Sequence, residues 1–467
     1  MIAPGVVLKR AAPFAIALAI WFVPVPAGLT ANSWHPFAIF LAAIACVLIG
    51  SFPLLTASMV AIATVVLTGT ITPAQAFSGF ANTSVLLVVI AFIVAQAVVK
   101  SGLGRRISLL MVSRFGGSPL GLAYSLVLTD AVIAPAFPSN TARGGVLFPI
   151  VLSIAKGAGS EPDSPEGRRL GGYLMFCSMA GLAVSSALWL TATSCNPIGV
   201  QIALKAGFEI TFGSWLLASS VPTLTAILIL PLLVSKLFSP GVGATPEAPA
   251  AARKDLAGMG SMSRDEWITA LTFVVMVAGW VFGNALHLNG TAVAFMGFGV
   301  LLVTGVLTID DISKQGDTLV TFLWLAVLFA LSAQLNELGF MGYVGERLAS
   351  RLGGLSWPVL YITLVALYVG LHYLFVSQTS QVLALFAVFL DVGIRGGVPA
   401  PLMAPGLLFA SSYFSVITPQ GGSQNIIFVA SGYLKQSELY KLGFFTTLAF
   451  MAVYLLIGTP WLRFVSH

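Results

Sequence analysis

The chain alternates long apolar runs with short polar or Gly/Pro-rich breaks from end to end. A membrane-crossing helix needs about 20 predominantly apolar residues to span about 30 Å of hydrocarbon. Many of the runs meet that length, so the pattern predicts an all-α polytopic membrane protein. We expect spans at 11–30, 34–51, 54–71, 82–100, 171–208, 213–238, 266–287, 290–309, 317–337, 402–434 and 438–462, with amphipathic stretches at 103–115 and 340–352.

The second half of the chain repeats features of the first about 237 residues later. Ser139-Asn140-Thr141 is followed by Ser377-Gln378-Thr379 at an offset of 238, and a run Arg-x-Gly-Gly that begins at Arg114 recurs at Arg351 at an offset of 237. Matches in one order at nearly one offset indicate a duplicated unit. In a chain this apolar, such a duplication is typical of transporters whose binding site lies at the repeat interface.

Charge predicts that the two copies are inverted. We assign an N-terminal transmembrane helix to 1–33, the first copy to 34–238, a linker rich in Ala, Pro and Gly to 239–265, and the second copy to 266–467. Four Lys and Arg side chains lie in or beside the first amphipathic stretch, and two lie in the second. Because Lys and Arg favour the cytoplasmic side, we expect the N-terminus and linker inside and the C-terminus outside. Each inverted copy then has five spans.

Composition places the chain in a membrane, which we expect to be a bacterial inner membrane, and it excludes several functions. Hydrophobic residues make up 58% of the chain and charged residues 8%, against roughly 25% charged in soluble domains. The formal charge of +6 comes from cations at the ends of apolar runs, so it does not indicate a nucleic-acid partner. Three cysteines without a CxxC pattern and four histidines without ligand spacing predict no disulfide or metal site. No nucleotide-binding or nucleophile motif supports an enzyme or an ATP-driven pump.

Two helical hairpins are expected to enter the membrane and turn back, at 119–156 and 357–395. Pro135 and Pro138 end the first arm, because proline cannot donate a backbone hydrogen bond and restricts the residue before it. Ser139, Asn140 and Thr141 then offer hydroxyl and amide groups, and a helix that starts at Thr141 presents free N–H groups to a carboxylate. The alternative is that this run is only a capped turn.

Two further helices are expected to be unwound inside the membrane, at Thr191–Asn196 and Thr418–Asn425. Both segments combine hydroxyl and amide side chains with a proline, and the second also contains two glycines. Irregular backbone at membrane depth survives where it is buried or lines a wet cavity, and unwound segments of transporters bind substrate and ions. We therefore take Thr193, Asn196 and Thr418 as substrate-binding candidates. The alternative is a kink that serves packing alone.

The run Pro-Ser-Asn-Thr-Ala-Arg-Gly-Gly-Val that begins at Pro138 resembles the divalent anion:sodium symporter (DASS) family. The run His372-Tyr373-Leu374 and the later Ser431-Gly432-Tyr433-Leu434 resemble its exchanger branch, which includes bacterial citrate/succinate and tartrate/succinate antiporters and plastid 2-oxoglutarate/malate translocators. The resemblance implies a homodimer that moves by an elevator mechanism. It also implies that the two Ser-x-Thr tips and the two unwound loops hold substrate carboxylates, and that Na⁺-coupled members build sodium sites there.

The chain departs from the symporter pattern where coupling to an ion is decided. Gln378 replaces the expected asparagine, and its longer side chain would enter the space of a bound ion. Arg143 follows the first tip, whereas its counterpart is Gln381, so this intramembrane cation belongs to one copy only. Such an arginine is costly and usually functional, and it could replace Na⁺ electrostatically by favouring a dianion. The alternatives are that Arg143 reaches a water-filled vestibule or pairs with Asp130.

We therefore expect an exchanger of di- or tricarboxylates of the succinate, malate, 2-oxoglutarate and citrate type, and not an enzyme. The predicted substrate-binding residues lie at the two tips and the two unwound loops: Ser139, Asn140, Thr141, Arg143, Thr193, Asn196, Ser377, Gln378, Thr379 and Thr418. The alternative function is a Na⁺- or H⁺-coupled dicarboxylate symporter of the same fold, in which Ser139, Asn140 and Gln378 would hold the Na⁺. No cofactor is expected.

Overall fold

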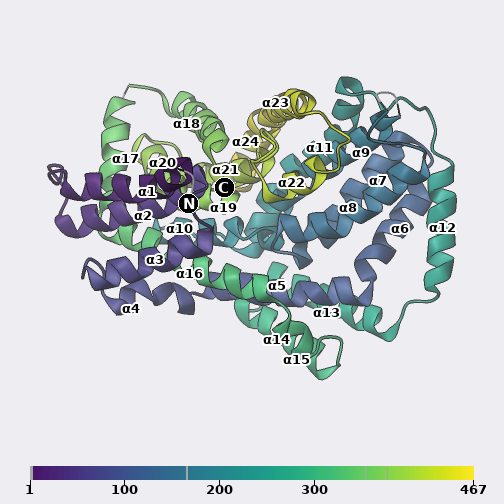
Figure 1. Cartoon of the computed structure of the whole chain (residues 1–467), viewed down its shortest axis with the longest axis horizontal. Coiled ribbons are helices and arrows are strands. Elements are labelled where there is room, and N and C mark those ends of the chain that lie inside the picture. The colour runs from purple at the N-terminus through teal and green to yellow at the C-terminus, as the bar shows by residue number, and fades with distance from the viewer. Residues whose placement is uncertain (1–3, 165–166, 353, 376, 467) are drawn as a thin grey trace. The chain divides into compact units, whose positions relative to one another are not determined.

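The computed structural model describes residues 4–164, 167–352, 354–375 and 377–466. Gly353, in the second Arg-x-Gly-Gly run, and Val376, just before the second Ser-x-Thr run, lie outside the described residues. Every regular element in the described part is a helix, which confirms the all-α prediction (Figure 1). Eight described helices are long and apolar enough to cross a membrane, and two more, of 14 residues each, are apolar but shorter.

The helices form two compact units, and each unit takes segments from both halves of the chain. Unit 1 comprises Met1–Val89, Pro197–Glu209 and Gln315–Leu407, and unit 2 comprises Ile90–Asn196, Ile210–Lys314 and Leu408–His467. The helices of unit 1 are α1 (Pro4–Phe22), α2 (Ala31–Ile49), α3 (Leu54–Leu67), α4 (Pro73–Ala76), η1 (Ser78–Ala81), α16 (Gly316–Glu337), α17 (Phe340–Arg351), α18 (Trp357–Leu371), η4 (His372–Leu374), α19 (Gln378–Gln381), η5 (Val382–Phe386) and α20 (Ala387–Arg395).

Unit 2 contains the first hairpin and both unwound segments. Its helices are α6 (Leu103–Phe115), α7 (Pro119–Ile133), η2 (Ala134–Ala136), α8 (Asn140–Gly157), α9 (Arg168–Leu188), η3 (Leu190–Ala192), α11 (Phe212–Leu237), α12 (Glu247–Met259), α13 (Arg264–Val281), α14 (Gly290–Val303), α15 (Ile309–Ser313), α22 (Ser423–Val429), α23 (Gln436–Val453), η6 (Tyr454–Gly458) and α24 (Thr459–Val465). Three helices run from one unit into the other: α5 (Thr83–Ser101), α10 (Cys195–Lys205) and α21 (Ala400–Tyr413).

Helix α9 forms the centre of unit 2. All residues of its apolar window are buried, and it packs against α7, α8 and α11. Close packing on α7 depends on Gly181, where an added Cβ would lie 2.9 Å from Val127 Cγ2. Small residues allow helix backbones to approach closely in membranes, where apolar side chains gain little from leaving lipid. The first hairpin, α7–η2–α8, is therefore mounted on the most buried helix of its unit.

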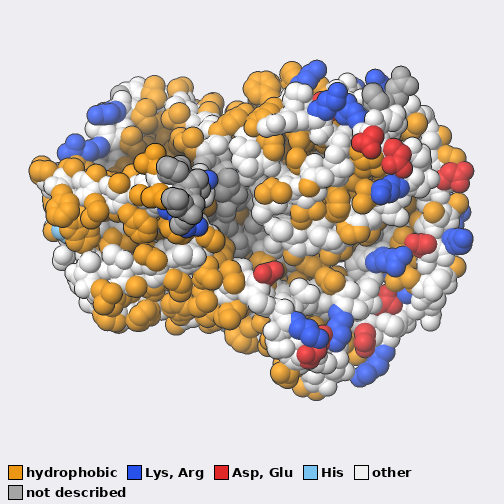
Figure 2. All heavy atoms as spheres, viewed as in Figure 1, with side chains coloured by type: hydrophobic (Ala, Val, Ile, Leu, Met, Phe, Trp, Pro, Cys, Tyr) orange, Lys and Arg blue, Asp and Glu red, His pale blue; other side chains and the backbone are white. Residues whose placement is uncertain are grey.

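In unit 1, a similar close approach fixes η1 on α16. A Cβ at Gly79 would lie 1.9 Å from the carbonyl oxygen of Ala326, so only glycine fits there. Figure 2 shows hydrophobic side chains over the face of α3 and α4, and charged side chains gathered over α12 and α15 of unit 2. Large apolar side chains on span surfaces are almost fully exposed, including Leu67 (86%) and Val303 (90%), as expected for lipid contact.

The local backbone repeats at the offsets seen in the sequence. Gly102 and Gly339 have nearly the same left-handed φ, 81° and 80°, and each precedes an amphipathic helix, α6 or α17. Short 3-10 helices follow α7 and α18 at matching positions, and each is followed by an extended serine. These features describe the local backbone of each copy and not how the two copies are oriented. The inverted orientation of the two copies and the boundaries of the predicted domains stay predictions.

The linker predicted at 239–265 contains a helix, α12, which composition did not indicate. Its Ala-rich sequence favours helix, and it lies alongside α6 (Figure 1). Thr245, just before α12, joins this segment to the end of α6. Its backbone N–H donates to the carbonyl oxygen of Gly117 at 3.1 Å, and its hydroxyl donates to that of Gly116 at 2.8 Å. Arg106 and Glu266 pair at 2.6 Å just beyond α12. The predicted linker is therefore part of unit 2.

Candidate functional site

The first hairpin turns at residues 137–139, between η2 and α8. Pro135 and Pro138 remove backbone donors from the turn, which ends the incoming helix. Ser139 is extended, with φ of −146°, and its hydroxyl accepts a hydrogen bond from the backbone N–H of Ala142 at 3.2 Å. This cap starts α8, an 18-residue helix. Its first N–H groups carry a partial positive charge, which suits a carboxylate.

Arg143 lies one turn into α8, is fully buried, and pairs with Asp130 of α7. Its Nη1 donates to Asp130 Oδ2 and to Ser185 Oγ, both at 2.7 Å. Its Nη2 donates to Asn140 Oδ1 at 2.5 Å and to Ser186 Oγ at 2.6 Å. Of the roles left open for Arg143, the structure shows the ion pair. Because a buried charge is costly unless it is paired, this cluster, which we call the ionic brace, ties α7, α8 and α9 together.

The ionic brace also occupies the side-chain oxygen of Asn140. Asn140 Oδ1 accepts a hydrogen bond from Arg143 Nη2 at 2.5 Å and lies 2.6 Å from Ser186 Oγ. The Ser186 hydroxyl has one proton to donate, and its oxygen also lies 2.6 Å from the carbonyl oxygen of Leu182. A cation held by oxygen ligands needs a lone pair, and one of the two lone pairs of Asn140 Oδ1 is taken by the guanidinium.

An asparagine closes each unwound segment in the same way. Asn196 Nδ2 donates to the carbonyl oxygens ten and seven residues before it, at 2.8 and 3.2 Å. Asn425 Nδ2 donates to the carbonyl oxygens ten and seven residues before it, at 2.9 and 3.0 Å. Each bond satisfies a carbonyl that the unwinding leaves without a helical partner. Asn196 therefore shapes the backbone, which is a role that the sequence did not distinguish from substrate contact.

The other polar side chains of the first unwound segment find partners inside the protein. Thr191 Oγ1 donates to the carbonyl oxygen of Pro135 at 3.0 Å, which joins this segment to the first hairpin. Cys195 Sγ lies 3.6 Å from both Thr193 Oγ1 and Asn196 Oδ1. The first unwound segment is thus bonded to the hairpin and to itself.

The second unwound segment reaches the tip of the first hairpin. Its backbone is irregular only up to Gly422, because α22 begins at Ser423, so the last three residues of the predicted segment, Ser423, Gln424 and Asn425, are helical. Helix α22 packs on α8. The hydroxyls of Thr141 at the tip and Ser423 at the start of α22 are 2.5 Å apart. Thr418, the predicted site residue in this segment, is 1% exposed. Unit 2 therefore brings seven of the predicted site residues into one set of connected segments: Ser139, Asn140, Thr141, Arg143, Thr193, Asn196 and Thr418.

The second tip lies in unit 1 and has the same backbone as the first. Ser377 is extended, with φ of −152°, and its hydroxyl accepts from the backbone N–H of Ser380 at 3.4 Å. Gln378 and Thr379 follow it in α19, and both are buried. The expectation that the two tips act on one substrate stays a prediction.

A neutral cluster takes the place of the ionic brace behind the second tip. Gln381, the counterpart of Arg143, is 1% exposed. Its Nε2 donates to the carbonyl oxygen of Tyr368 at 2.7 Å, and its Oε1 is bonded to Nδ1 of the buried His372. We call these three residues the neutral brace. His372 therefore joins the two arms of the second hairpin.

Sequence reasoning missed the serines of the ionic brace and the polar residues that begin α22. Ser185 and Ser186 lie in an apolar helix, where a serine is ordinary and only the three-dimensional neighbours reveal its role. Ser423 and Gln424 belong to the second unwound segment, but nothing in their spacing separated them from loop residues. The signal available in the sequence was a pair of adjacent serines in an otherwise apolar helix that follows a hairpin containing an arginine.

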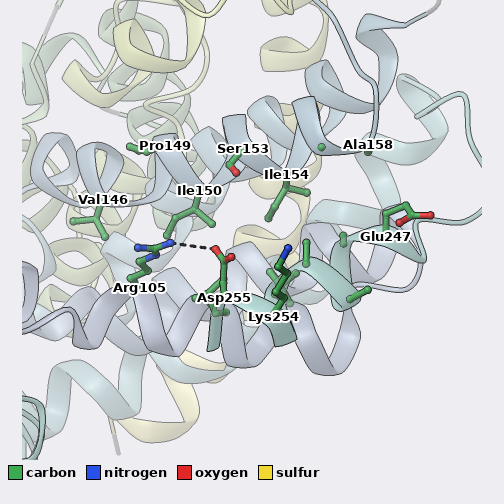
Figure 3. A pocket seen from close by; sticks show the side chains of 17 residues that line it. Arg105, Val146, Pro149, Ile150, Ser153, Ile154, Ala158, Glu247, Lys254 and Asp255 are labelled. Carbon is green, nitrogen blue, oxygen red and sulfur yellow. Dashed lines mark hydrogen bonds and ion pairs between the residues drawn. The ribbon is translucent and has the colours of Figure 1, made fainter. Parts of the chain in front are cut away.

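A cavity of about 660 Å³ in unit 2 lies apart from these residues (Figure 3). Its wall is largely apolar, with Val146, Pro149 and Ile150 contributed by α8. Arg105 of α6 and Asp255 of α12 pair across it at 3.1 Å. None of the predicted site residues lines it, because it lies against the later turns of α8 and not its start. Among the described residues, no group of His, Cys, Asp and Glu is placed to hold a metal ion.

Known proteins resemble the chain over nearly its whole length. It is 37% identical to YflS of Bacillus subtilis, named as a candidate malate transporter, over 96% of this chain and 94% of that protein. It is 35% identical to dicarboxylate transporter 2, chloroplastic, of Spinacia oleracea (95% and 80%), and 30% identical to the citrate/succinate antiporter of Escherichia coli K12 (97% and 97%). The solved Alcanivorax borkumensis YdaH transporter shares the fold, with a TM-score of 0.57 and 16% identity over 84% of this chain and 88% of that one.

The family profile described as "Sodium:sulfate symporter transmembrane region" matches residues 6–467. This match covers both hairpins and both unwound segments. It confirms the resemblance noted in the sequence, and it identifies an integral membrane transporter and not an enzyme. The chain belongs to the sodium:sulfate symporter family, the DASS transporters.

Proposed function

We propose that the chain exchanges di- or tricarboxylates of the succinate, malate, 2-oxoglutarate and citrate type across the bacterial inner membrane. The names of three relatives describe malate, dicarboxylate and citrate/succinate transport. The first tip supplies a capped helix start and hydroxyl groups, a combination that suits carboxylates. The fold and the chemistry of the tip thus support an anion as the substrate.

The observation that carries exchange, as opposed to sodium symport, is the hydrogen bond that Arg143 donates to Asn140 Oδ1. In a Na⁺-coupled carrier, Ser139 and Asn140 would supply ion ligands. Here the guanidinium of Arg143 lies 2.5 Å from that oxygen. A Na⁺ bound there would have to displace this hydrogen bond inside a fully buried cluster. A hydrogen bond to a charged donor contributes about 1.5–3 kcal/mol, so ion binding there is opposed.

In this proposal each tip binds a carboxylate. At the first tip, Asn140 and Thr141 and the start of α8 hold it. Ser377, Gln378 and Thr379 hold a carboxylate in the same way, and Thr193 and Thr418 line the unwound segments. Arg143 and Asn196 act as positioning residues, because Nη1 and Nη2 of Arg143 and Nδ2 of Asn196 are engaged with protein groups.

In this proposal, exchange is obligatory because of the positive electrostatic field at the tips. The charges of Arg143 and Asp130 offset one another, so the remaining positive field at the first tip is that of the start of α8, equivalent to about half an elementary charge. A site without its anion leaves this field unbalanced and crosses the membrane poorly. We further propose that the protein is a homodimer and that an elevator movement carries the site across, as the family resemblance implies.

Sodium replacement in proteoliposomes separates the proposal from its alternative, a Na⁺- or H⁺-coupled symporter of this fold. Vesicles preloaded with unlabelled succinate should take up labelled succinate at the same rate in Na⁺, K⁺ and choline media, and at the same rate when a proton gradient is collapsed. A saturable rise in uptake with external Na⁺ would establish symport. The family description, which names sodium, is the reason to test this alternative first.

Cysteine labelling tests the proposed orientation, with the N-terminus and linker in the cytoplasm and the C-terminus outside. Cys46, Cys177 and Cys195 are buried, so the wild type gives a low background. Lys254→Cys places an exposed thiol on α12. We expect a membrane-impermeant maleimide to label it in inside-out vesicles but not in intact cells. Labelling in intact cells would reverse the assignment.

A further inference from the structure

Three polar side chains in the second unwound segment are buried without a hydrogen-bond partner for key atoms. Gln424 is 0% exposed, and neither Oε1 nor Nε2 has a partner among the described residues. The same holds for Oγ1 of Thr418 and Oδ1 of Asn425, which are 1% and 0% exposed. A buried polar group without a partner is unfavourable, because it has lost its hydrogen bonds to water and gained none in return. Four such atoms within eight residues of one segment indicate a place prepared for a ligand.

The backbone around Gln424 is shaped to hold its amide in place. A Cβ at Gly422 would lie 2.5 Å from Gln424 Nε2 and 2.6 Å from Oε1, so the amide rests directly on this glycine. A Cβ at Gly144 would lie 3.5 Å from Gln424 Cβ. Gly144 is one turn after Asn140 on α8. The Gln424 side chain therefore starts against the helix that begins at the first tip, and its amide rests on Gly422.

The first unwound segment shows what a satisfied version looks like. There the residue before the bracing asparagine is Cys195, and its thiol lies 3.6 Å from Asn196 Oδ1. The corresponding atom of the second segment, Asn425 Oδ1, has no partner in the described part of the chain. Gln424 stands where Cys195 stands, immediately before the asparagine. The two segments share a backbone brace, but only the second leaves donors and acceptors open.

The open atoms require a ligand that both donates and accepts hydrogen bonds. Gln424 Nε2 is a donor, Thr418 Oγ1 is both donor and acceptor, and Gln424 Oε1 and Asn425 Oδ1 are acceptors. A fully ionised, unsubstituted dicarboxylate such as succinate offers acceptors only. It can satisfy Nε2 and the threonine hydroxyl, but it leaves two amide oxygens unpaired. A carboxylate with a hydroxyl on the adjacent carbon offers acceptors and one donor together.

We propose that Gln424, with Thr418 and Asn425, makes this transporter selective for 2-hydroxy di- and tricarboxylates over their unsubstituted analogues. The substrate hydroxyl donates to Gln424 Oε1 or to Asn425 Oδ1, and the adjacent carboxylate accepts from Gln424 Nε2 and Thr418 Oγ1. The inference rests on the proposed function and specifies its substrate. A site built to bond a hydroxyl rejects the analogue that lacks it, because the buried partners stay unpaired.

Competition in proteoliposomes tests the selectivity. The inhibition constants of L-malate and succinate are measured against one labelled anion, in the wild type and in Gln424→Leu. We expect the wild type to prefer malate by at least tenfold. In Gln424→Leu the preference should fall about tenfold, since net hydrogen bonds of about 1 kcal/mol each are lost, while succinate is still transported. An unchanged malate/succinate ratio in Gln424→Leu would overturn the inference.

Gly422→Ala tests the same atoms while keeping Gln424. Gly422 has φ of −143°, which any residue adopts, so alanine acts only by displacing the amide that it would contact at 2.5 Å. We expect Gly422→Ala to lower the malate preference as Gln424→Leu does. The double variant should lose no more of the malate preference than either single variant, because the two substitutions remove the same interaction. Additive losses would contradict the shared cause.

Gln334→Leu in α16 is the matched control, because Gln334 is also buried but its Nε2 is paired with Glu337 at 2.7 Å. Its malate/succinate ratio should equal that of the wild type. The malate/succinate preference can also be measured as the thermal stabilisation of detergent-purified protein by each anion. This measurement needs no transport, so it also tests a variant that transports poorly. If the wild type binds neither anion, the proposed function fails. If it binds both equally and Gln424→Leu changes nothing, only this inference fails.

Discussion

The two hairpins share a backbone but are braced by different chemistry. Both turn at an extended serine whose hydroxyl caps the returning helix. Thirteen residues separate Asp130 from Arg143 in the first hairpin, and the same number separates Tyr368 from Gln381 in the second. In the first hairpin these two residues form an ion pair, and in the second the Gln381 amide donates a hydrogen bond to the backbone carbonyl of Tyr368. The two copies therefore share the backbone of the turn but differ in the side chains that stabilise it.

The difference teaches where electrostatics matter in this fold. Behind the first tip, a guanidinium is buried among a carboxylate, two serines and an asparagine. Behind the second, every member of the neutral brace can be replaced without leaving a buried charge. Losing one member of a buried ion pair costs about 3–5 kcal/mol, whereas losing a neutral hydrogen bond costs about 0.5–1.5 kcal/mol. The first hairpin is therefore the more sensitive of the two.

Converting the first brace into the second should have the largest effect. Arg143→Gln leaves the Asp130 carboxylate buried and unpaired, so we expect a loss of about 3–5 kcal/mol in stability and little folded protein. The double variant Asp130→Asn, Arg143→Gln removes both charges and should recover much of the loss. Thermal unfolding of purified protein gives the comparison. A double variant as unstable as the single variant would show that the ion pair is not the cause.

Truncating either tip should reduce transport strongly. Removal of a hydrogen bond to a charged ligand costs about 1.5–3 kcal/mol, so Asn140→Ala and Thr379→Ala should each lower exchange by about 10- to 100-fold. Thr379→Ala should leave the amount of folded protein unchanged. Uptake of labelled succinate by preloaded vesicles, per amount of folded protein, gives the effect. Wild-type exchange in either variant would exclude that tip from the binding site.

Removing the neutral brace should cost less than removing the ionic one. Gln381→Leu deletes the bonds to the carbonyl of Tyr368 and to His372, for an expected loss of about 1–3 kcal/mol. The same thermal measurement ranks it against Arg143→Gln. A loss as large as that of Arg143→Gln would mean that burial of the hairpin, and not charge, sets its sensitivity.

An ion pair between the end of a span and a short helix beyond the spans should show the smallest effect. Lys100 lies 2.6 Å from Asp311 of α15 and, with Thr308, lowers the pKa of Asp311 to about 2. Since this is below the usual value of about 3.9, the pair stabilises the fold above that value, and the contribution disappears as the pH falls through about 2. Asp311→Asn should lower the melting temperature slightly at pH 6, because an exposed pair is screened by solvent. The difference should vanish near pH 2, and a constant difference would contradict the assignment.

Local signals in the sequence were enough to predict the hairpins and the unwound segments. Pro138 and Ser139 determine the first turn through a missing donor and a cap, and the repeat located the second turn. Asn196 and Asn425 were recognised as polar breaks for the same reason. These features act within a few residues along the chain, so they can be read without the fold.

The partners of these residues depend on the packing of distant segments and could not be predicted. Ser186 becomes part of the site only because α9 crosses behind the first tip, and the sequence of an apolar helix does not specify its neighbours. For α12 the same limit applies to its position alongside α6, because the Ala-rich sequence favours a helix but does not specify its neighbour. Gln424 could not be predicted for another reason. It stands out because its amide has no partner in the described part of the chain, and only the structure reveals this.

The most direct test of the account is a comparison of empty and anion-loaded proteoliposomes with a double label. Vesicles that contain one labelled dicarboxylate are placed in medium that contains a differently labelled one. We predict that uptake and efflux are equal in number, and that empty vesicles take up almost nothing even when a Na⁺ gradient points inward. Accumulation in empty vesicles driven by that gradient would contradict exchange and establish sodium symport.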